Sequence, residues 1–381
     1  MTQLSRHLRF SAYFAAVFLV LGIYLPFWPL WLEARGLGAE EIGLILAVAS
    51  WARVIGMPLV GRLADRGGRS HGTMLIAAAL SVALFALFFG AAGFWPILLL
   101  HLAWALAYNP LIPLGEARSM ASVRDHGLDY GRMRLWGSLA FILGSLIAGE
   151  AVGWRGPEII VALILAGLLA ALVSTATLPR DDAATPQGER PAGFKTLLAD
   201  RRFLLFLAAA SLLQSSHAAY YGFSSLHWSA AGHSEATIGW LWAEGVIAEV
   251  LLFMVAGKLI ARLGPAWLLA LAGIGAVLRW TVLAATTELP FLILAQTLHA
   301  LTFGAAHLGV VHFIAARAPE GLKATAQSVY AAVSGGLVMG ASFWLAGRLY
   351  NTEGSAAFIA MAALGGLGLL GALLLSRERD A

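Results

Sequence analysis

The sequence contains no cysteine among its 381 residues, and only 12% of its residues are charged. The absence of cysteine excludes disulfide bonds, thiolate nucleophiles and cysteine-ligated metal sites. A soluble globular domain carries about 25% charged residues, so the low charge content indicates a chain whose surface mostly does not meet water. The alternating pattern of a membrane barrel, a metal-binding helix motif and a nucleotide-binding loop are also missing. We therefore expect a helical membrane protein with no enzymatic activity, no bound metal and no organic cofactor.

Long apolar runs dominate instead. The chain is 60% hydrophobic, and its mean hydropathy is +0.79. Each run is close to the roughly 20 residues that cross a bilayer as a helix, and backbone hydrogen bonding in lipid requires helices. The first run is too long for a signal peptide, and no cleavage site follows it. We predict twelve transmembrane helices, at residues 10–32, 42–63, 73–93, 95–117, 132–153, 157–178, 203–228, 236–257, 267–286, 289–315, 325–347 and 355–376.

One long polar stretch, residues 179–202, separates the first six predicted spans from the last six. We interpret it as a cytoplasmic linker between an N-terminal half, residues 1–178, and a C-terminal half, residues 203–381. An Ile-Gly pair followed by Gly-basic-Leu at residues 42–63 recurs 196 residues later, at residues 238–259. This repeat predicts two six-helix bundles related by a pseudo-twofold axis.

The placement of Lys and Arg predicts the orientation. Of the 25 such residues, 19 lie in segments that are cytoplasmic if the N-terminus is inside, and three lie in outer loops. Cytoplasmic loops of membrane proteins carry the excess of positive charge, so we expect both termini on the cytoplasmic side of the inner membrane. Five tryptophans fall at the predicted outer boundary, where an aromatic belt is expected: Trp28, Trp31, Trp95, Trp154 and Trp228.

The loop after the second predicted span carries the most specific motif. It reads Gly-Arg-Leu-Ala-Asp-Arg-Gly-Gly-Arg over residues 61–69 and resembles the G-x-L-x-D-R-x-G-R signature of the major facilitator superfamily. The resemblance implies the major facilitator fold and a transporter. Gly61 permits a close helix approach, and Asp65 can pair with arginines or face a helix N-terminus. We expect a conformational latch made by Gly61, Asp65, Arg66 and Arg69; the alternative is a basic loop that only fixes topology.

Ionisable residues inside spans are the candidate functional residues, because they are costly in lipid. Residues 109–116, Asn-Pro-Leu-Ile-Pro-Leu-Gly-Glu, and residues 130–137, Tyr-Gly-Arg-Met-Arg-Leu-Trp-Gly, resemble the lactose permease family of oligosaccharide:proton symporters. That resemblance implies a substrate-binding ion pair of Glu116 with Arg134, for which a purely structural pair is the alternative. It also implies a proton-coupling site that contains Arg279 and His299.

Several site positions depart from that family. Thr302 stands where the family has a carboxylate one turn after the histidine, Gln296 replaces a lysine, and Phe141 replaces the tryptophan that stacks on the sugar. Val246 takes the place of the family's substrate-linked glutamate, and Glu249 lies one turn later. These departures predict a retained proton-coupled scaffold with an altered substrate site.

A second resemblance extends over nearly the whole chain. The segments at residues 25–32, 216–224 and 245–250 resemble the phenylpropionate permease family. This family resemblance implies proton symport of an aromatic carboxylate. The expected partners are a small-molecule substrate and membrane lipid, with no nucleic acid, and the expected state is a monomer.

Each candidate residue receives a predicted role. Desolvation in lipid makes a carboxyl group bind a proton more readily, so Glu249 is the candidate proton carrier and Glu244 the alternative. His299 is a proton relay or a structural interhelical histidine. Arg134 or Arg279 would hold the substrate carboxylate, and aromatic surface would come from Phe141, Trp136 and Tyr220. Arg53 lies one repeat length before Glu249 and either binds an anionic substrate or pairs structurally.

These features predict a secondary active transporter that is driven by the proton gradient and imports a small organic anion such as 3-phenylpropionate. A proton-coupled sugar or nucleoside symporter is the alternative, and an exporter remains open because direction is not encoded in these motifs.

Overall fold

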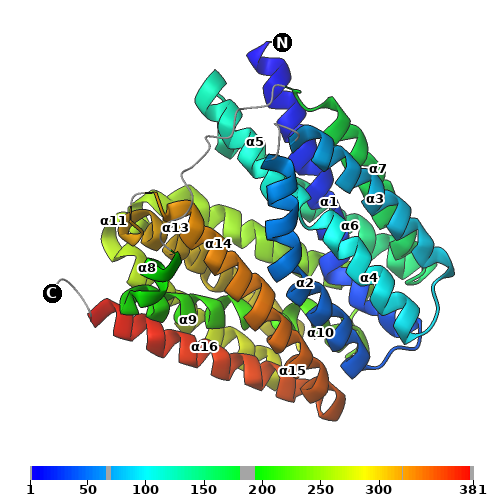
Figure 1. The fold of residues 1–381 in the computed structure, drawn as a ribbon. Helices are drawn as coiled ribbons and strands as arrows, with labels where there is room; N and C mark the ends of the chain where they lie inside the picture. Colours follow the sequence, from blue (N-terminus) through cyan, green and yellow to red (C-terminus); the bar gives the residue numbers. More distant parts are fainter. Residues whose placement is uncertain (1, 66–69, 181–193, 320, 378–381) are drawn as a thin grey trace. The chain divides into compact units, whose positions relative to one another are not determined.

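The computed structural model describes residues 2–65, 70–180, 194–319 and 321–377, and every regular element within these ranges is helical (Figure 1). The side chains of residues 57–65, 194, 195, 258 and 261 are not described. The elements are α1 (Gln3–Ala34), α2 (Ala39–Asp65), α3 (Ser70–Ala86), η2 (Leu87–Gly90), α4 (Phe94–Tyr108), α5 (Leu111–His126), α6 (Tyr130–Arg155), α7 (Ile159–Thr177), α8 (Phe194–Ala199), α9 (Arg201–Ser215), α10 (Ala218–Ala230), α11 (Glu235–Ala285), α12 (Leu289–Thr297), η3 (Ala300–Ala305), α13 (Ala306–Arg317), α14 (Lys323–Tyr330), η4 (Ala331–Val338), α15 (Met339–Thr352) and α16 (Gly354–Arg377).

The predicted all-helical membrane fold is confirmed. Eleven helical stretches in the described ranges are long and apolar enough to cross a membrane, and each overlaps one predicted span. The remaining predicted span, residues 42–63, coincides with α2. The helices extend further into their polar flanks than hydropathy indicates. For example, α1 begins at Gln3, where the Thr2 hydroxyl accepts the Ser5 backbone N–H at 3.2 Å and caps the first turn.

Two of the predicted spans join in α11, which is 51 residues long. The helical path is interrupted at Gly264, whose φ of 72° is left-handed. Glycine adopts this conformation without a side-chain clash, and Pro265 then occupies the first turn of the next helix, where its missing N–H is not needed. The two spans, Glu235–Gly257 and Arg262–Ala285, therefore meet at a sharp break rather than a long loop.

One compact unit contains Met1–Leu37, Ala52–Gln187 and Gly232–Ala243. In it α1 packs against both α6 and α7. Trp28 and Trp31 of α1 stack with ring centroids 4.6 Å apart, and both are fully buried. The aromatic-belt prediction is therefore wrong for these two residues, because they fill a protein core. Trp95 and Trp154, at 67% and 79% exposed, have the accessibility that a belt requires.

The second compact unit contains Gly38–Trp51, Gly188–Ala231 and Glu244–Ala381. Here α9 packs along α16 and η4, and the rings of Phe206 and Phe313 stack at 4.0 Å within the core. Trp228 is also fully buried, so it does not belong to an aromatic belt. The division of the chain into halves at residues 179–202 stays a prediction.

Close glycine contacts recur at the spacing of the sequence repeat. In the second unit, a Cβ at Gly43 of α2 would lie 2.8 Å from the Gly347 Cα of α15. In the first unit, a Cβ at Gly239, which is 196 residues after Gly43, would lie 3.3 Å from the Gly149 Cα of α6. Small residues permit such backbone approaches in membrane helices. The two repeated glycines therefore both lie at a close contact between two helices, α2 with α15 in one unit and α11 with α6 in the other.

Adjacent glycines of α16 provide a test of this packing. A Cβ at Gly365 would meet the Ala276 Cβ at 2.8 Å, whereas one at Gly366 would meet the Val277 Cγ2 at an ordinary 3.7 Å. We expect Gly365→Ala to destabilise the protein by about 1–3 kcal/mol through overpacking. The matched control Gly366→Ala should be neutral or stabilising, because alanine favours helices. Thermal unfolding of the purified protein in detergent measures both, and equal midpoints for the two variants would contradict the packing described.

Candidate functional site

A fully buried arginine forms the centre of the second unit's polar cluster. Arg279 lies in α11 and is 0% exposed. One guanidinium nitrogen, Nη1, donates to His299 Nδ1 at 2.8 Å and to Thr302 Oγ1 at 3.0 Å. The other, Nη2, donates to Gln296 Oε1 at 2.5 Å. All of these acceptors come from the single helical stretch α12–η3, and none of them is a carboxylate.

Aromatic rings cover the faces of the same guanidinium. The Arg279 Cζ lies 4.3 Å from the Tyr220 ring centroid and 4.7 Å from that of Trp280. Gln296 donates to the Tyr220 hydroxyl at 3.2 Å, which ties the ring of α10 to the cluster. The negative faces of aromatic rings attract a cation. The predicted aromatic residue Tyr220 thus lies beside the predicted proton-coupling residues Arg279 and His299.

The hydrogen bonds define the tautomers of two buried histidines, His217 and His299. His217 Nδ1 lies 3.0 Å from the Gln214 carbonyl, and because a carbonyl only accepts, Nδ1 carries the hydrogen. In the neutral ring, Nε2 is then the acceptor for the Thr302 hydroxyl at 3.1 Å. His299 Nδ1 accepts from Arg279, so the Nε2 of neutral His299 carries its hydrogen.

The hydrogen on His299 Nε2 lies toward Glu249. The Glu249 Oε2 is 3.7 Å from this nitrogen, and the two side chains retain 15% and 9% exposure. Glu249 is therefore connected through one imidazole to Arg279. Glu244, the alternative proton carrier, instead accepts from the Thr297 hydroxyl at 2.9 Å on an exposed part of α12.

The backbone around His299 is locally widened. η3 is a π-helix of six residues that begins directly after His299 and contains Thr302. Single π-helical turns interrupt α-helices mostly at functional sites. A second π-helix, η4, packs against α9, where the Ser215 hydroxyl donates to the Ser334 carbonyl at 3.2 Å. The π-helical turn changes the helical register between the residues before it, Gln296 and His299, and the residues that follow it.

Four predicted substrate-binding residues lie in the first unit. The Arg134 guanidinium covers the Phe18 ring at 3.8 Å, and Glu116 is partly buried on α5. The structure records no ion pair within 4 Å between these two described side chains. Arg53 donates to the Asn109 Oδ1 at 3.0 Å. Phe141 is 8% exposed and lies in α6. Their predicted roles in substrate binding stay predictions.

The predicted latch lies largely outside what the structure describes. Arg66 and Arg69 are outside the described residues, and the side chain of Asp65 is not described. Gly61 belongs to α2. The latch stays a prediction.

The structure adds residues for which sequence reasoning gave no role. Gln296 and Thr302 were identified only as departures from a family, and His217 only lies within the resembling segment 216–224, yet all three belong to the Arg279 cluster. One signal was present: polar residues recur at positions 296, 299 and 302 of an apolar span. A spacing of three places them on neighbouring positions of one helix face.

Comparisons with known proteins agree with the fold. The sequence profile described as "MFS_1 like family" matches residues 7–360. The chain is 38% identical over 350 residues to the "Probable 3-phenylpropionic acid transporter" of Escherichia coli (strain K12), with 91% of each chain covered. It is 29% identical to the "Maltose permease" of Geobacillus stearothermophilus, with 87% of this chain and 85% of the permease covered.

A solved structure shows the same fold. The crystal structure of the nucleoside transporter NupG superposes with a TM-score of 0.83 and covers 97% of this chain and 98% of its own, at 15% sequence identity. The helical spans, the motif after the second span and the profile match all agree. The chain is therefore a multi-pass membrane transporter that belongs to the MFS_1-like family of the major facilitator superfamily.

Proposed function

We propose that the protein is a proton-coupled symporter that imports a small organic anion, with 3-phenylpropionate or a related aromatic acid as the substrate. The proposal rests on the similarity to the E. coli transporter and on the chemistry of the Arg279 cluster. Transport would proceed by alternating access, in which two halves rock about a binding site. We further propose a monomer in the inner membrane with both termini in the cytoplasm.

One observation supports a substrate that carries a carboxylate. Arg279 is 0% exposed, and the recorded acceptors of its Nη atoms are neutral side chains. Its Nε hydrogen has no acceptor within the part of the chain that the structure describes. A buried charge in a membrane protein is costly and marks a functional site. A carboxylate from the substrate would supply both the missing acceptor and the missing negative charge.

Glu249 would supply the coupling to protons. When Glu249 is ionised, its charge partly balances Arg279 through His299; when it is protonated, the cluster has an excess positive charge. Binding of a proton therefore strengthens the binding of an anion, and by thermodynamic linkage the anion strengthens the binding of the proton. Such mutual stabilisation would make the two ligands cross the membrane together.

The alternative is a proton-coupled sugar or nucleoside symporter. The 29% identity to the maltose permease favours it, and the fold of NupG is compatible with it. The same cluster offers hydroxyl, amide and imidazole groups that could bind a polar neutral substrate. A comparison of substrates in one assay separates the two functions.

The first prediction concerns substrate chemistry. In de-energised vesicles that contain the protein, 3-phenylpropionate should raise the external pH, because protons enter with it. Its neutral amide should not compete for uptake, since it lacks the carboxylate for Arg279. Arg279→Gln should lower apparent affinity by at least about 30-fold, the effect of losing a buried charge partner. Proton movement with maltose or nucleosides, and none with any aromatic acid, would favour the alternative.

The second prediction concerns the proton carrier. Glu249→Gln cannot release a proton, so we expect it to lose proton-driven accumulation while retaining exchange of internal for external substrate. The matched control Glu244→Gln should retain both activities, because Glu244 accepts from the Thr297 hydroxyl at 2.9 Å, whereas Glu249 lies beside the His299 imidazole. Accumulation retained in Glu249→Gln and lost in Glu244→Gln would assign the carrier to Glu244.

The third prediction concerns Thr302, which links Arg279 to His217. Thr302→Val leaves a buried donor and a buried acceptor without a partner, and each loss costs about 1–3 kcal/mol. We expect a clearly lowered thermal unfolding midpoint. Thr297→Val removes the same hydroxyl from an exposed position and should change the midpoint little. Equal changes would show that Thr302 does not support the cluster.

A further inference from the structure

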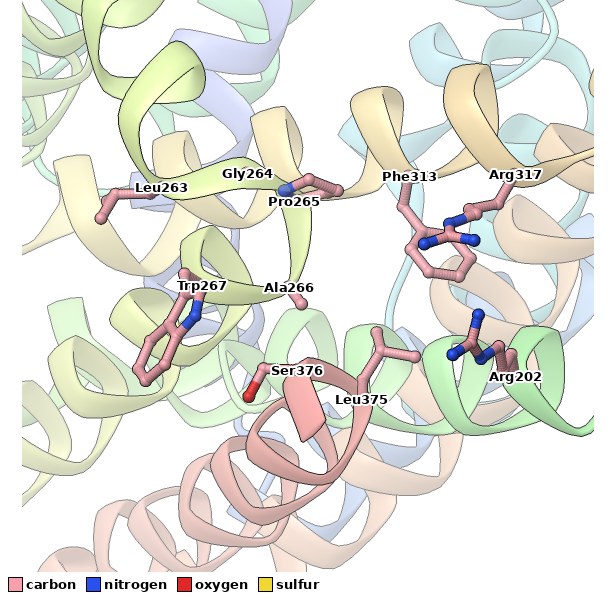
Figure 2. Close-up of a pocket in the computed structure, with 10 residues that line it drawn as sticks. All are labelled: Arg202, Leu263, Gly264, Pro265, Ala266, Trp267, Phe313, Arg317, Leu375 and Ser376. Atoms are coloured by element: carbon pink, nitrogen blue, oxygen red, sulfur yellow. The ribbon is translucent and has the colours of Figure 1, made fainter. Parts of the chain in front are cut away.

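A second polar feature of the second unit lies at one end of its helices. A cavity of about 110 Å³ is lined by Arg202, Leu263, Gly264, Pro265, Ala266, Trp267, Phe313, Arg317, Leu375 and Ser376 (Figure 2). These residues come from the start of α9, the break in α11, and the last turns of α13 and α16. The break at Gly264 turns the chain away from its helical path and so opens space between the four helices.

The size of the cavity excludes the transport substrate. Pockets for small-molecule ligands usually measure about 300–1,000 Å³, several times more than this one. None of its lining residues belongs to the Arg279 cluster. A single compact group, rather than a whole organic molecule, fits the available volume.

The charge of the lining is positive. Arg202 and Arg317 contribute guanidinium groups, and none of the ten lining residues is acidic. Figure 2 shows both guanidinium groups on the same side of the view. Both arginines also interact with other groups of the chain, but a guanidinium has five N–H donors and can bind an additional acceptor. The nearby Asp200 carboxylate is used to cap α9, where it accepts the Arg202 backbone N–H at 2.9 Å.

Apart from Ser376, the rest of the lining carries no polar side chain except the Trp267 indole, and it reaches the surface. Phe313 and Leu375 belong to the hydrophobic core of the unit, and Trp267 is 45% exposed. The four helix segments are ends of candidate membrane spans, with Arg202 at the second residue of one and Arg317 at the last of another. Arginine and tryptophan at the ends of spans are typical of the membrane–water interface. The positive-inside rule places this end on the cytoplasmic side.

We propose that this cavity binds the phosphodiester head group of an anionic phospholipid. Arg202 and Arg317 hold the phosphate through charge-assisted hydrogen bonds, and Trp267 lies at the depth of the glycerol backbone. The acyl chains lie outside the cavity along the apolar helix surface. Basic pockets between membrane helices on the cytoplasmic side recognise anionic head groups in this way.

Phosphate could also come from a soluble compound, but the site favours a lipid. The cavity lies at the ends of membrane spans, and apolar side chains form much of its wall. A soluble phosphate ester gains nothing from that wall, whereas a lipid is already held at this depth by its chains. Binding of a lipid here does not depend on which substrate the protein transports, so it can be tested separately from the proposed function.

Native mass spectrometry of the full-length protein in detergent measures this binding. Phosphatidylglycerol and phosphatidylcholine with identical acyl chains are titrated, and we expect phosphatidylglycerol to bind more tightly by about tenfold, as charge-assisted bonds predict. Arg202→Gln combined with Arg317→Gln should abolish this preference. The control pair Arg155→Gln with Arg348→Gln removes the same charge elsewhere and should keep it.

A second variant distinguishes a loss of lipid binding from a folding defect. Within the described ranges, the Ser376 hydroxyl bonds only its own helix, at the Leu373 carbonyl, so Ser376→Glu should fold and should repel a phosphate from the cavity. A preference within twofold of the wild type in both cavity variants, or an equal loss in the control pair, overturns the proposal. Displacement of phosphatidylglycerol by an equal concentration of glycerol 3-phosphate would show a site for soluble phosphate and would overturn the assignment to lipid.

Discussion

A positive charge that is fully buried among membrane-spanning helices requires acceptors, and the second unit is arranged around that requirement. Arg279 uses both Nη atoms on residues of one helical stretch, α12–η3. Those residues are in turn held by neighbouring helices: Thr302 by His217, and Gln296 by Tyr220. The network therefore fixes α10, α11 and α12 relative to one another within the unit. Removing any one of its members would leave a buried polar group unsatisfied.

The surroundings of the arginines in the first unit differ from those of Arg279. Two of its arginines have neutral neighbours: Arg134 lies over the Phe18 ring and Arg53 bonds Asn109. Its core is instead a cluster of aromatic rings around Trp28, which stacks on Trp31 and His101 and meets Phe88 edge-on. The repeat thus preserves helix packing, as the Gly43 and Gly239 contacts show, while the buried chemistry of the two units has diverged. Arg53 and Glu249, which match in the repeat, have opposite charge.

The sequence predicts the helices well and the cluster only in part. Spans are predictable because an apolar run of about 20 residues has one stable solution in lipid. The proximity of Arg279 to His299 followed from a family resemblance. The burial of Trp28 and Trp31 did not follow, because hydropathy cannot distinguish a side chain that faces lipid from one that faces a protein core. The π-helix after His299 could not be predicted from the sequence either, since it depends on tertiary packing rather than on the composition of residues 300–305.

The neutral residues of the cluster carry as much information as the charged ones. Thr302 and Gln296 occupy positions where the lactose permease family, by resemblance, has a carboxylate and a lysine. With both charges gone, the proposed proton coupling depends on the balance between Arg279 and Glu249. Protonation of Glu249 would convert a nearly neutral cluster into a cationic one, and a low local dielectric would make that change large. An anionic substrate would compensate the added positive charge, whereas a neutral sugar would not. The replacements therefore favour coupling of a proton to an anion over coupling of a proton to a sugar.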